Sequence, residues 1–297
     1  MGVAARWLWP LAVANLAANV AIVVTGGAVR VTGSGLGCPT WPRCTEASYV
    51  VHGELGVHGV IEFGNRMLTF VLVAIAIACW VAALLARRRR PLVWATVIAL
   101  GIPAQAVLGG FTVLSDLNPW VVALHLLVSM AIIAVCVLLV DSLRGPARTA
   151  APERVRRLGW LVFAATWVVL YLGTVVTGSG PHSGGAESRR TGLDPQVVSH
   201  VHAVAVYVLL ALTIGLVVLA RRSGARQFAR AAAALLGVEL AQGVVGFTQY
   251  LLDLPEALVV LPLLGAALVS ASVTGVVLAG RQRSRGSSAT ATNSSAR

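Results

Sequence analysis

The segment that decides the fold is an apolar run near the start of the chain, WLWPLAVANLAANVAIVVTGGAV, which extends from Trp7 to Val29. Such a run is long enough to cross the ~30 Å of hydrocarbon in a bilayer. It is too long for the apolar core of a signal peptide, and no small-residue cleavage site ends it cleanly, so we interpret it as a retained membrane span. A polar, glycine-rich stretch follows it, VTGSGLGCPTWPRC, from Val31 to Cys44.

The composition indicates that most of the chain lies in a membrane. Of the 297 residues, 57% are hydrophobic and only 11% are charged, whereas about 25% are charged in a typical soluble domain. The net charge of +12 could suggest nucleic-acid binding, but the basic residues, all arginine, flank the apolar runs as orientation signals do. We therefore expect membrane lipid around the protein and no nucleic-acid partner.

The apolar runs predict an all-α integral membrane protein with eight transmembrane helices. The expected spans are residues 7–29, 58–86, 92–114, 119–140, 158–177, 196–220, 228–251 and 256–279. Arginine gathers in every second connection and after the last span, at residues 87–90, 144–157, 221–226 and 281–285. These segments are therefore expected in the cytoplasm with both termini. The opposite loops are expected outside, at residues 30–57, 115–118, 178–195 and 252–255.

The two halves of the chain repeat one another. Three pairs of identical residues are separated by 137 positions: Gln105 and Gln242, Gly109 and Gly246, and Asp116 and Asp253. The tetrapeptide Thr-Gly-Ser-Gly starts at Thr32 and again at Thr177. We expect two tandem four-helix bundles, residues 1–145 and 146–285, related by an axis along the membrane normal, and a disordered tail at residues 286–297.

A layer of polar side chains crosses the predicted spans near their outer ends. The 137-residue offset sets Asn65 against His202 and His125 against Pro262. Polar groups inside membrane spans are costly and are functional candidates by default. Histidines that face one another across a four-helix bundle commonly bind heme or metal. The alternative is a histidine that only hydrogen-bonds a neighbouring helix.

Glu62 is the candidate acid or base. It lies almost one helical turn before Asn65, so both side chains can face one cavity. A carboxylate beside a cofactor can relay protons. The alternative is a structural ion pair with Arg66 or Arg30.

Other titratable residues are weaker candidates. Glu239, midway along the seventh span, either serves proton transfer or hydrogen-bonds a neighbouring helix. His58 is expected at the membrane interface. The remaining histidines lie in or near the external loops: His52, His182 and His200.

The four cysteines fall into two classes. Cys38 and Cys44 lie close together in a loop expected on the oxidising side, where a disulfide is the default. A metal site is less favoured because no histidine lies at suitable spacing nearby, and a catalytic thiol pair is the third interpretation. Cys79 and Cys136 lie inside spans and are expected to be packing residues.

Three motifs of the chain resemble those of the heme A synthase family. They are GGAVRVTGSGLGCPTWPRC at 26–44, EFGNR at 62–66 and GSGPH at 178–182, and the likeness extends over all eight spans. The resemblance implies a plasma-membrane enzyme that oxidises a methyl group of heme O to the formyl group of heme A. The product serves assembly of the terminal cytochrome oxidase, with heme O synthase and an electron-transfer protein as expected partners.

The resemblance also assigns roles to the residues. In the family each half offers a pair of axial histidines. It implies that His125 binds the substrate heme O in the N-terminal half and that His202 binds a heme b cofactor in the C-terminal half. It further implies that Glu62 is needed for activity and that Cys38 and Cys44 form a disulfide.

Two arginines near the outer interface complete the expected site. Arg30 and Arg66 are suited to pair with heme propionates, because the guanidinium group binds carboxylates in a bidentate manner.

The chain departs from the family pattern at two positions. Asn65 stands where the first histidine is expected, which resembles an actinobacterial-like branch, and Pro262 stands where the fourth is expected. One ligand, His125, would leave an open iron face lined by Glu62 and Asn65. Proline cannot bind iron, and inside a helix it removes a backbone hydrogen bond. Heme b binding by His202 alone is therefore expected to be altered in affinity or in redox potential.

The missing histidines leave two other functions open. One is a non-catalytic heme-binding membrane protein, such as an electron carrier or a heme-handling paralogue. The other is a transporter, which would require discontinuous helices and a polar site at the membrane midplane.

Overall fold

The computed structural model describes residues 3–144, 150–180, 184, 188–252, 258 and 260–281. Eight long α-helices account for most of these residues: α1 (Val3–Val31), α2 (Gly56–Leu85), α3 (Arg89–Leu114), α4 (Pro119–Leu143), α5 (Glu153–Ser179), α6 (Pro195–Arg222), α7 (Arg226–Leu251) and α8 (Val260–Ala279). A short 3-10 helix, η1 (Gly53–Leu55), precedes α2. All eight α-helices are long and apolar enough to cross a membrane, which confirms the predicted all-α membrane fold. The expected disordered tail and Asp253 lie outside the described residues.

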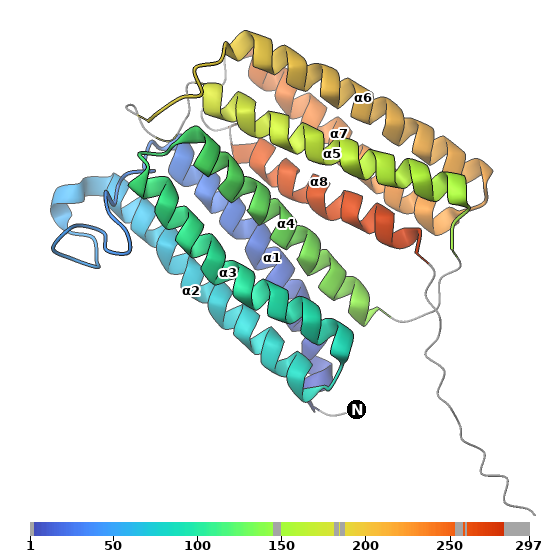
Figure 1. Ribbon diagram of the computed structural model, residues 1–297, viewed down its shortest axis with the longest axis horizontal. Helices are drawn as coiled ribbons and strands as arrows, with labels where there is room; N and C mark the ends of the chain where they lie inside the picture. The colour runs from blue at the N-terminus through green and yellow to red at the C-terminus, as the bar shows by residue number, and fades with distance from the viewer. Residues whose placement is uncertain are drawn as a thin grey trace, which may run out of the picture.

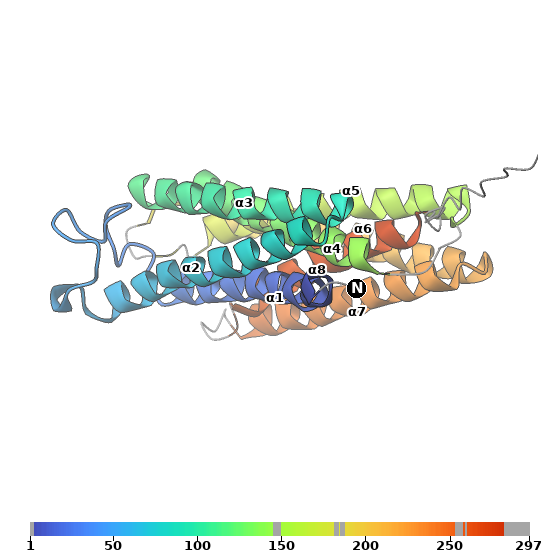
Figure 2. The same ribbon diagram turned by 90° about the horizontal axis from the view of Figure 1, so that it is seen from below.

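The helices pack as two similar four-helix units (Figure 1). In the first unit α1 contacts α2, α2 contacts α3, α3 contacts α4, and α4 closes the ring on α1. The same cycle joins α5, α6, α7 and α8. α2 and α4 therefore face each other across the diagonal of the first unit, and α6 and α8 across that of the second. Seen edge-on, the helices of both units run roughly along one direction (Figure 2).

The units meet along α1, α4, α5 and α8. Val23, Met130 and Leu170 belong to a buried apolar cluster at this contact. The Ser270 hydroxyl of α8 donates a hydrogen bond of 2.8 Å to the Met130 carbonyl of α4. A polar bond inside an apolar contact satisfies a buried hydroxyl, which would otherwise be costly.

Each unit has its own hydrophobic core, and both cores lie toward the same end of the molecule. The first contains Leu8, Ala76, Ile98 and Leu139, and the second contains Val162, Leu216, Leu235 and Val273. These residues come from the starts of α1, α3, α5 and α7 and from the ends of the other four helices. We call the opposite end, where α1 ends and α2 begins, the loop end. There α6 has no buried residue from 195 to 208, so the cores leave room for the polar layer.

Local sequence explains several helix ends. Gly33, two residues after the end of α1, has a φ of 64°, a left-handed conformation that glycine adopts without strain. At α4 the Asn118 side chain accepts a bond from Trp120 N–H at 3.0 Å, and Pro119 occupies the first helical position. Asp194 and Pro195 begin α6 in the same way.

Pro262 lies in the first turn of α8, because the helix begins at Val260. First-turn N–H groups have no partner inside the helix, so a proline there removes no helical hydrogen bond. The expected loss of a backbone bond at this position is therefore wrong. Pro262 still offers no ligand atom where the repeat places His125 in α4.

Candidate functional site

The glycine-rich stretch forms a cover at the loop end. Cys38 and Cys44 are joined by a disulfide, as predicted, and both are fully buried. We call residues 32–55 the cover loop. The disulfide closes a small ring within it, so this part of the cover has little conformational freedom.

Short contacts bind the cover loop to its surroundings. The Gly37 backbone lies directly against the backbone of His58 and Gly59 at the start of α2, where a Cβ would overlap it. The Ser34 hydroxyl hydrogen-bonds His58 Nδ1 at 2.9 Å, and the Gly35 N–H donates to the Gly184 carbonyl at 3.0 Å. The glycines of the motif thus allow backbones to approach closely.

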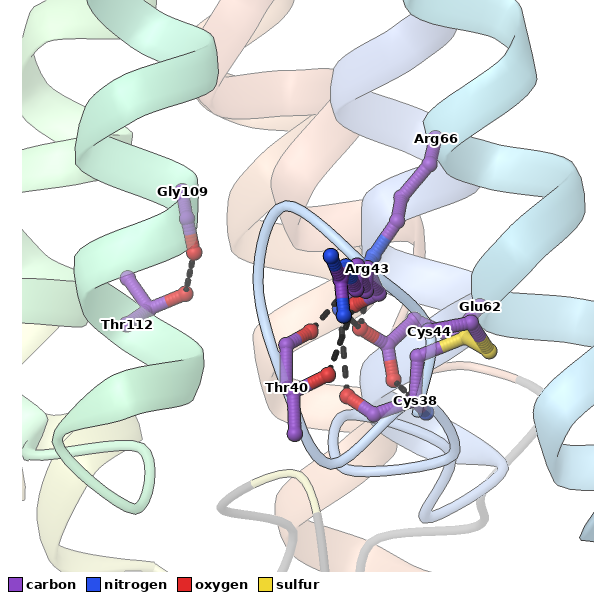
Figure 3. A network of polar contacts seen from close by, with 8 residues as sticks. All are labelled: Cys38, Thr40, Arg43, Cys44, Glu62, Arg66, Gly109 and Thr112. Carbon is purple, nitrogen blue, oxygen red and sulfur yellow. Dashed lines mark hydrogen bonds and ion pairs between the residues drawn. A yellow bond between two sulfur atoms is a disulfide. The ribbon is translucent and has the colours of Figure 1, made fainter. Parts of the chain in front are cut away.

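Glu62 and Arg66 fasten the disulfide ring to α2 (Figure 3). The buried Glu62 carboxylate accepts the Cys38 N–H at 2.6 Å and binds the Arg66 guanidinium, with 2.6 Å between Nη2 and Oε1. Arg66 also donates to the carbonyls of Cys38, Thr40 and Arg43 at 3.1, 3.0 and 3.2 Å. The structural ion pair with Arg66, considered from the sequence, is therefore present, and a proton-relay role of Glu62 stays a prediction.

Trp41 connects the cover loop to α3 of the N-terminal unit. Its indole packs on Gly110 of α3, where a Cβ would overlap the ring. The cover therefore bridges α2, through Glu62 and Arg66, and α3, through Trp41. The sequence reasoning missed this contact, although two adjacent glycines inside a span, Gly109 and Gly110, are a signal of close approach.

The two candidate iron ligands occupy similar settings in different units. The His125 ring of α4 packs on Gly109 of α3, where a Cβ would lie 3.3 Å from the ring carbon Cε1. The His202 ring of α6 packs on Gly173 of α5 at the same 3.3 Å. Among the described residues, neither buried Nδ1 atom has a hydrogen-bond partner. We call Gly109 and Gly173 the histidine seats.

Polar groups around His125 hold its backbone. Gln105 of α3 donates from Nε2 to the His125 carbonyl at 2.9 Å and also hydrogen-bonds the Ser129 hydroxyl. Ser129 in turn donates to the His125 carbonyl at 2.9 Å. These bonds join α3 to α4 at the histidine, which limits movement of this turn.

Asn65 and Arg30 are tied to neighbouring helices. The Thr25 hydroxyl of α1 donates to the Asn65 side-chain oxygen at 2.8 Å. Arg30 Nη2 donates to the Thr177 carbonyl of α5 at 2.6 Å, so it joins the two units. Arg30 also lines a small cavity between α1, α4 and α5, together with Arg189.

The weaker candidates lie apart from the histidine seats. Glu239 is buried in α7, where it accepts a bond from Thr213 of α6 at 2.9 Å. The exposed His200 bonds the Gln196 carbonyl of its own helix at 2.7 Å, and His52 is exposed at the start of η1. His182 lies outside the described residues.

Comparison with known families identifies the chain. The model of the family COX15-CtaA, described as "Cytochrome oxidase assembly protein", matches residues 6–182. The chain belongs to this family. A relative from Methylobacterium sp. (strain 4-46), named "Heme A synthase", is 31% identical over 84% of this chain and 84% of its own length. Another of that name, from Bacillus pumilus (strain SAFR-032), is 33% identical over 52% of this chain and 54% of its own.

Family membership confirms the resemblance carried by the cover loop and by the motif at 62–66, since both lie within the matched residues. The placement in an actinobacterial-like branch stays a prediction. The eight helices run without a break through their stated bounds, so the discontinuous helices required by the transporter alternative are not found in the described part of the chain.

Proposed function

We propose that this chain is a heme A synthase, which oxidises a methyl group of heme O to the formyl group of heme A for assembly of the terminal cytochrome oxidase. One observation carries the proposal: each four-helix unit holds a histidine ring on a glycine seat in the polar layer. The names of the COX15-CtaA relatives support the same activity.

The residues present fit heme better than a bare metal ion. Among the described residues, no group of three or more His, Cys, Asp or Glu side chains is placed to hold a metal ion. A heme brings four ring nitrogens and needs only an axial ligand from the protein, which one histidine supplies.

We assign the N-terminal unit, residues 1–145, to the substrate heme O and the C-terminal unit, residues 146–285, to a heme b. His125 would hold the first and His202 the second. A bound heme supplies an iron that changes oxidation state, while the side chains orient the ring and control access of water. Because Pro262 offers no second ligand, the heme b would have one histidine.

The cover loop would close the N-terminal site. Glu62 and Arg66 hold it on α2 and Trp41 holds it on α3, so it lies over the end of the unit that carries His125. Excluding water strengthens the electrostatic interactions inside a site and prevents side reactions. Arg30 would then place a heme propionate at the boundary between the units.

The arginine distribution supports the proposed orientation in the plasma membrane. The end opposite to the cover carries Arg87, Arg88, Arg89 and Arg90, which by the positive-inside rule belong in the cytoplasm. Both termini then lie in the cytoplasm and the disulfide lies outside. Heme O synthase and an electron-transfer protein are the proposed partners.

Heme extraction from membranes tests the proposal. His125→Ala should abolish heme A in a strain that depends on this chain, whereas His200→Ala, at an exposed histidine, should leave it unchanged. Purified wild-type protein should carry heme. Normal heme A in the His125→Ala strain would overturn the assignment.

Glu62 needs a separate comparison, because its loss also releases the cover. Glu62→Gln keeps an acceptor for the Cys38 N–H, while Arg66→Ala removes the fastening of the cover and leaves the carboxylate. Loss of heme A in Glu62→Gln with a closed cover would support a proton-transfer role. Normal heme A in that variant would restrict Glu62 to holding the loop.

A further inference from the structure

The two histidine seats lie on different helices of their units, and each is on a helix adjacent to the one that carries the histidine. His125 comes from the fourth helix of its unit and His202 from the second helix of its own. Each ring meets a glycine of an adjacent, antiparallel helix, at 3.3 Å from the position a Cβ would take. This distance is shorter than ordinary van der Waals contact, so a methyl group at the seat would require the histidine ring to move by a few tenths of an ångström.

Each histidine seat has a counterpart in the other unit, at a place where the repeat has no histidine. Gly246 of α7 corresponds to Gly109, and a Cβ built on it meets nothing within 4 Å among the described residues, because Pro262 replaces the histidine. Counting back from the shared Thr-Gly-Ser-Gly, the position that corresponds to Gly173 is Ala28.

In the second helix of the N-terminal unit, the position that corresponds to His202 holds an asparagine with a hydrogen-bond partner of its own. Asn65 corresponds to His202, and its side-chain oxygen accepts the Thr25 hydroxyl. Thr25 corresponds to Leu170 in α5, which cannot make this bond. Ala28 lies three residues after Thr25, so it is on the same face of α1, about one turn closer to the loop end. A methyl group thus stands where the histidine site has a bare backbone.

We propose that a glycine seat on the neighbouring helix is what admits an axial histidine in this fold, and that Ala28 with Thr25 restricts the N-terminal site to one protein ligand. Gly109 and Gly173 are therefore positioning residues for the heme iron, acting through His125 and His202. The side of the N-terminal heme that faces Asn65 stays open for a small exogenous ligand. This inference rests on the proposed heme-binding function.

The first test adds a methyl group at a seat. With His202→Ala as background, so that only the N-terminal heme remains, Gly109→Ala is compared with Gly246→Ala, the same change at the repeat position with open space. Groups that orient a ligating histidine typically change metal affinity about 10-fold to 100-fold. We expect a loss in heme affinity of this order for Gly109→Ala and none for Gly246→Ala.

Heme content per protein and the spin state in the absorption spectrum are the readouts, so the test does not depend on activity. Gly173→Ala, with His125→Ala as background, should behave as Gly109→Ala does. Equal heme content and unchanged spectra in Gly109→Ala and Gly246→Ala would overturn the seat assignment.

The second test builds the missing ligand, and it does not depend on a destabilised variant. In the His202→Ala background, Asn65→His alone should leave the heme high-spin, because Ala28 obstructs the ring. Asn65→His combined with Ala28→Gly should give a low-spin, bis-histidine spectrum. A low-spin spectrum from Asn65→His alone would refute the role of Ala28, as would a double variant that stays high-spin.

The outcomes separate this inference from the proposed function. If the wild-type protein and both single-histidine backgrounds bind no heme, the proposed function fails. If they bind heme while the alanine variants at both seats are indistinguishable from the Gly246→Ala control, only the inference about the seats fails.

Discussion

Arg66→Ala should open the cover loop while leaving the helical units folded. The Arg66 guanidinium makes five hydrogen bonds: two to Glu62 and one each to the carbonyls of Cys38, Thr40 and Arg43. The Arg66 side chain is 19% exposed and that of Glu62 only 7%, so both lie largely out of water. Removing the arginine would leave an uncompensated carboxylate against the disulfide ring.

Removal of one partner from a buried ion pair typically costs about 3–5 kcal/mol. Partial exposure of Arg66 favours the lower end, about 3 kcal/mol for closing the cover. Each 1.4 kcal/mol is a factor of about ten in an equilibrium constant, so the open population should rise about 100-fold. Adding Glu62→Gln to Arg66→Ala should recover part of this loss, because the buried charge is then removed as well.

Amide hydrogen exchange of the cover loop measures this opening, since local unfolding exposes the Cys38 N–H that Glu62 protects. Arg43→Ala is the matched control in the same loop. Its exposed side chain contacts only the Glu46 carbonyl and the Tyr49 ring among the contacts recorded for the described residues. Exchange that is no faster in Arg66→Ala than in Arg43→Ala would refute the view that Arg66 holds the cover.

Two further predictions concern the disulfide and the core. Cys38 and Cys44 should resist a membrane-impermeant maleimide until a reductant is added, and labelling of both thiols in untreated membranes would contradict the bridge. Ile98→Ala, at a fully buried position of the N-terminal core, should lower the free energy of unfolding in detergent by about 2–5 kcal/mol. Leu100→Ala, at a side chain that is 69% exposed, is the control, and an equal loss there would contradict the placement of the core.

The length of the apolar runs predicts all eight spans, but some helices extend into charged residues beyond the apolar run. The fifth span was expected to begin at residue 158, whereas α5 begins at Glu153. Glu153 forms ion pairs of 2.9 Å with Arg156 and Arg157 one turn later, so the helix continues past the apolar segment. A hydropathy pattern cannot detect such an extension, because the residues that form it are polar.

The candidate site could be predicted only as a list of polar residues. The spacing of Glu62 and Arg66 allowed an ion pair, but the groups that complete it are backbone atoms of the cover loop, which has no periodic pattern. Likewise, the repeat pointed to His125 and His202, while the seats Gly109 and Gly173 became evident only when adjacent helices were placed together. Contacts between a side chain and the backbone of an irregular loop, such as those of Arg66 with the cover loop, carry no sequence signature of their own.

One turn of α3 joins the cover to the histidine. The Trp41 indole packs on Gly110, and the His125 ring packs on the preceding residue, Gly109. The Thr112 hydroxyl donates to the Gly109 carbonyl at 2.6 Å, in the part of α3 that lies across from the disulfide ring (Figure 3). A displacement of the indole therefore acts on the same turn that supports the histidine. Since packed interiors transmit strain over such short distances, we expect closure of the cover loop to affect the orientation of the His125 ring through these two adjacent glycines.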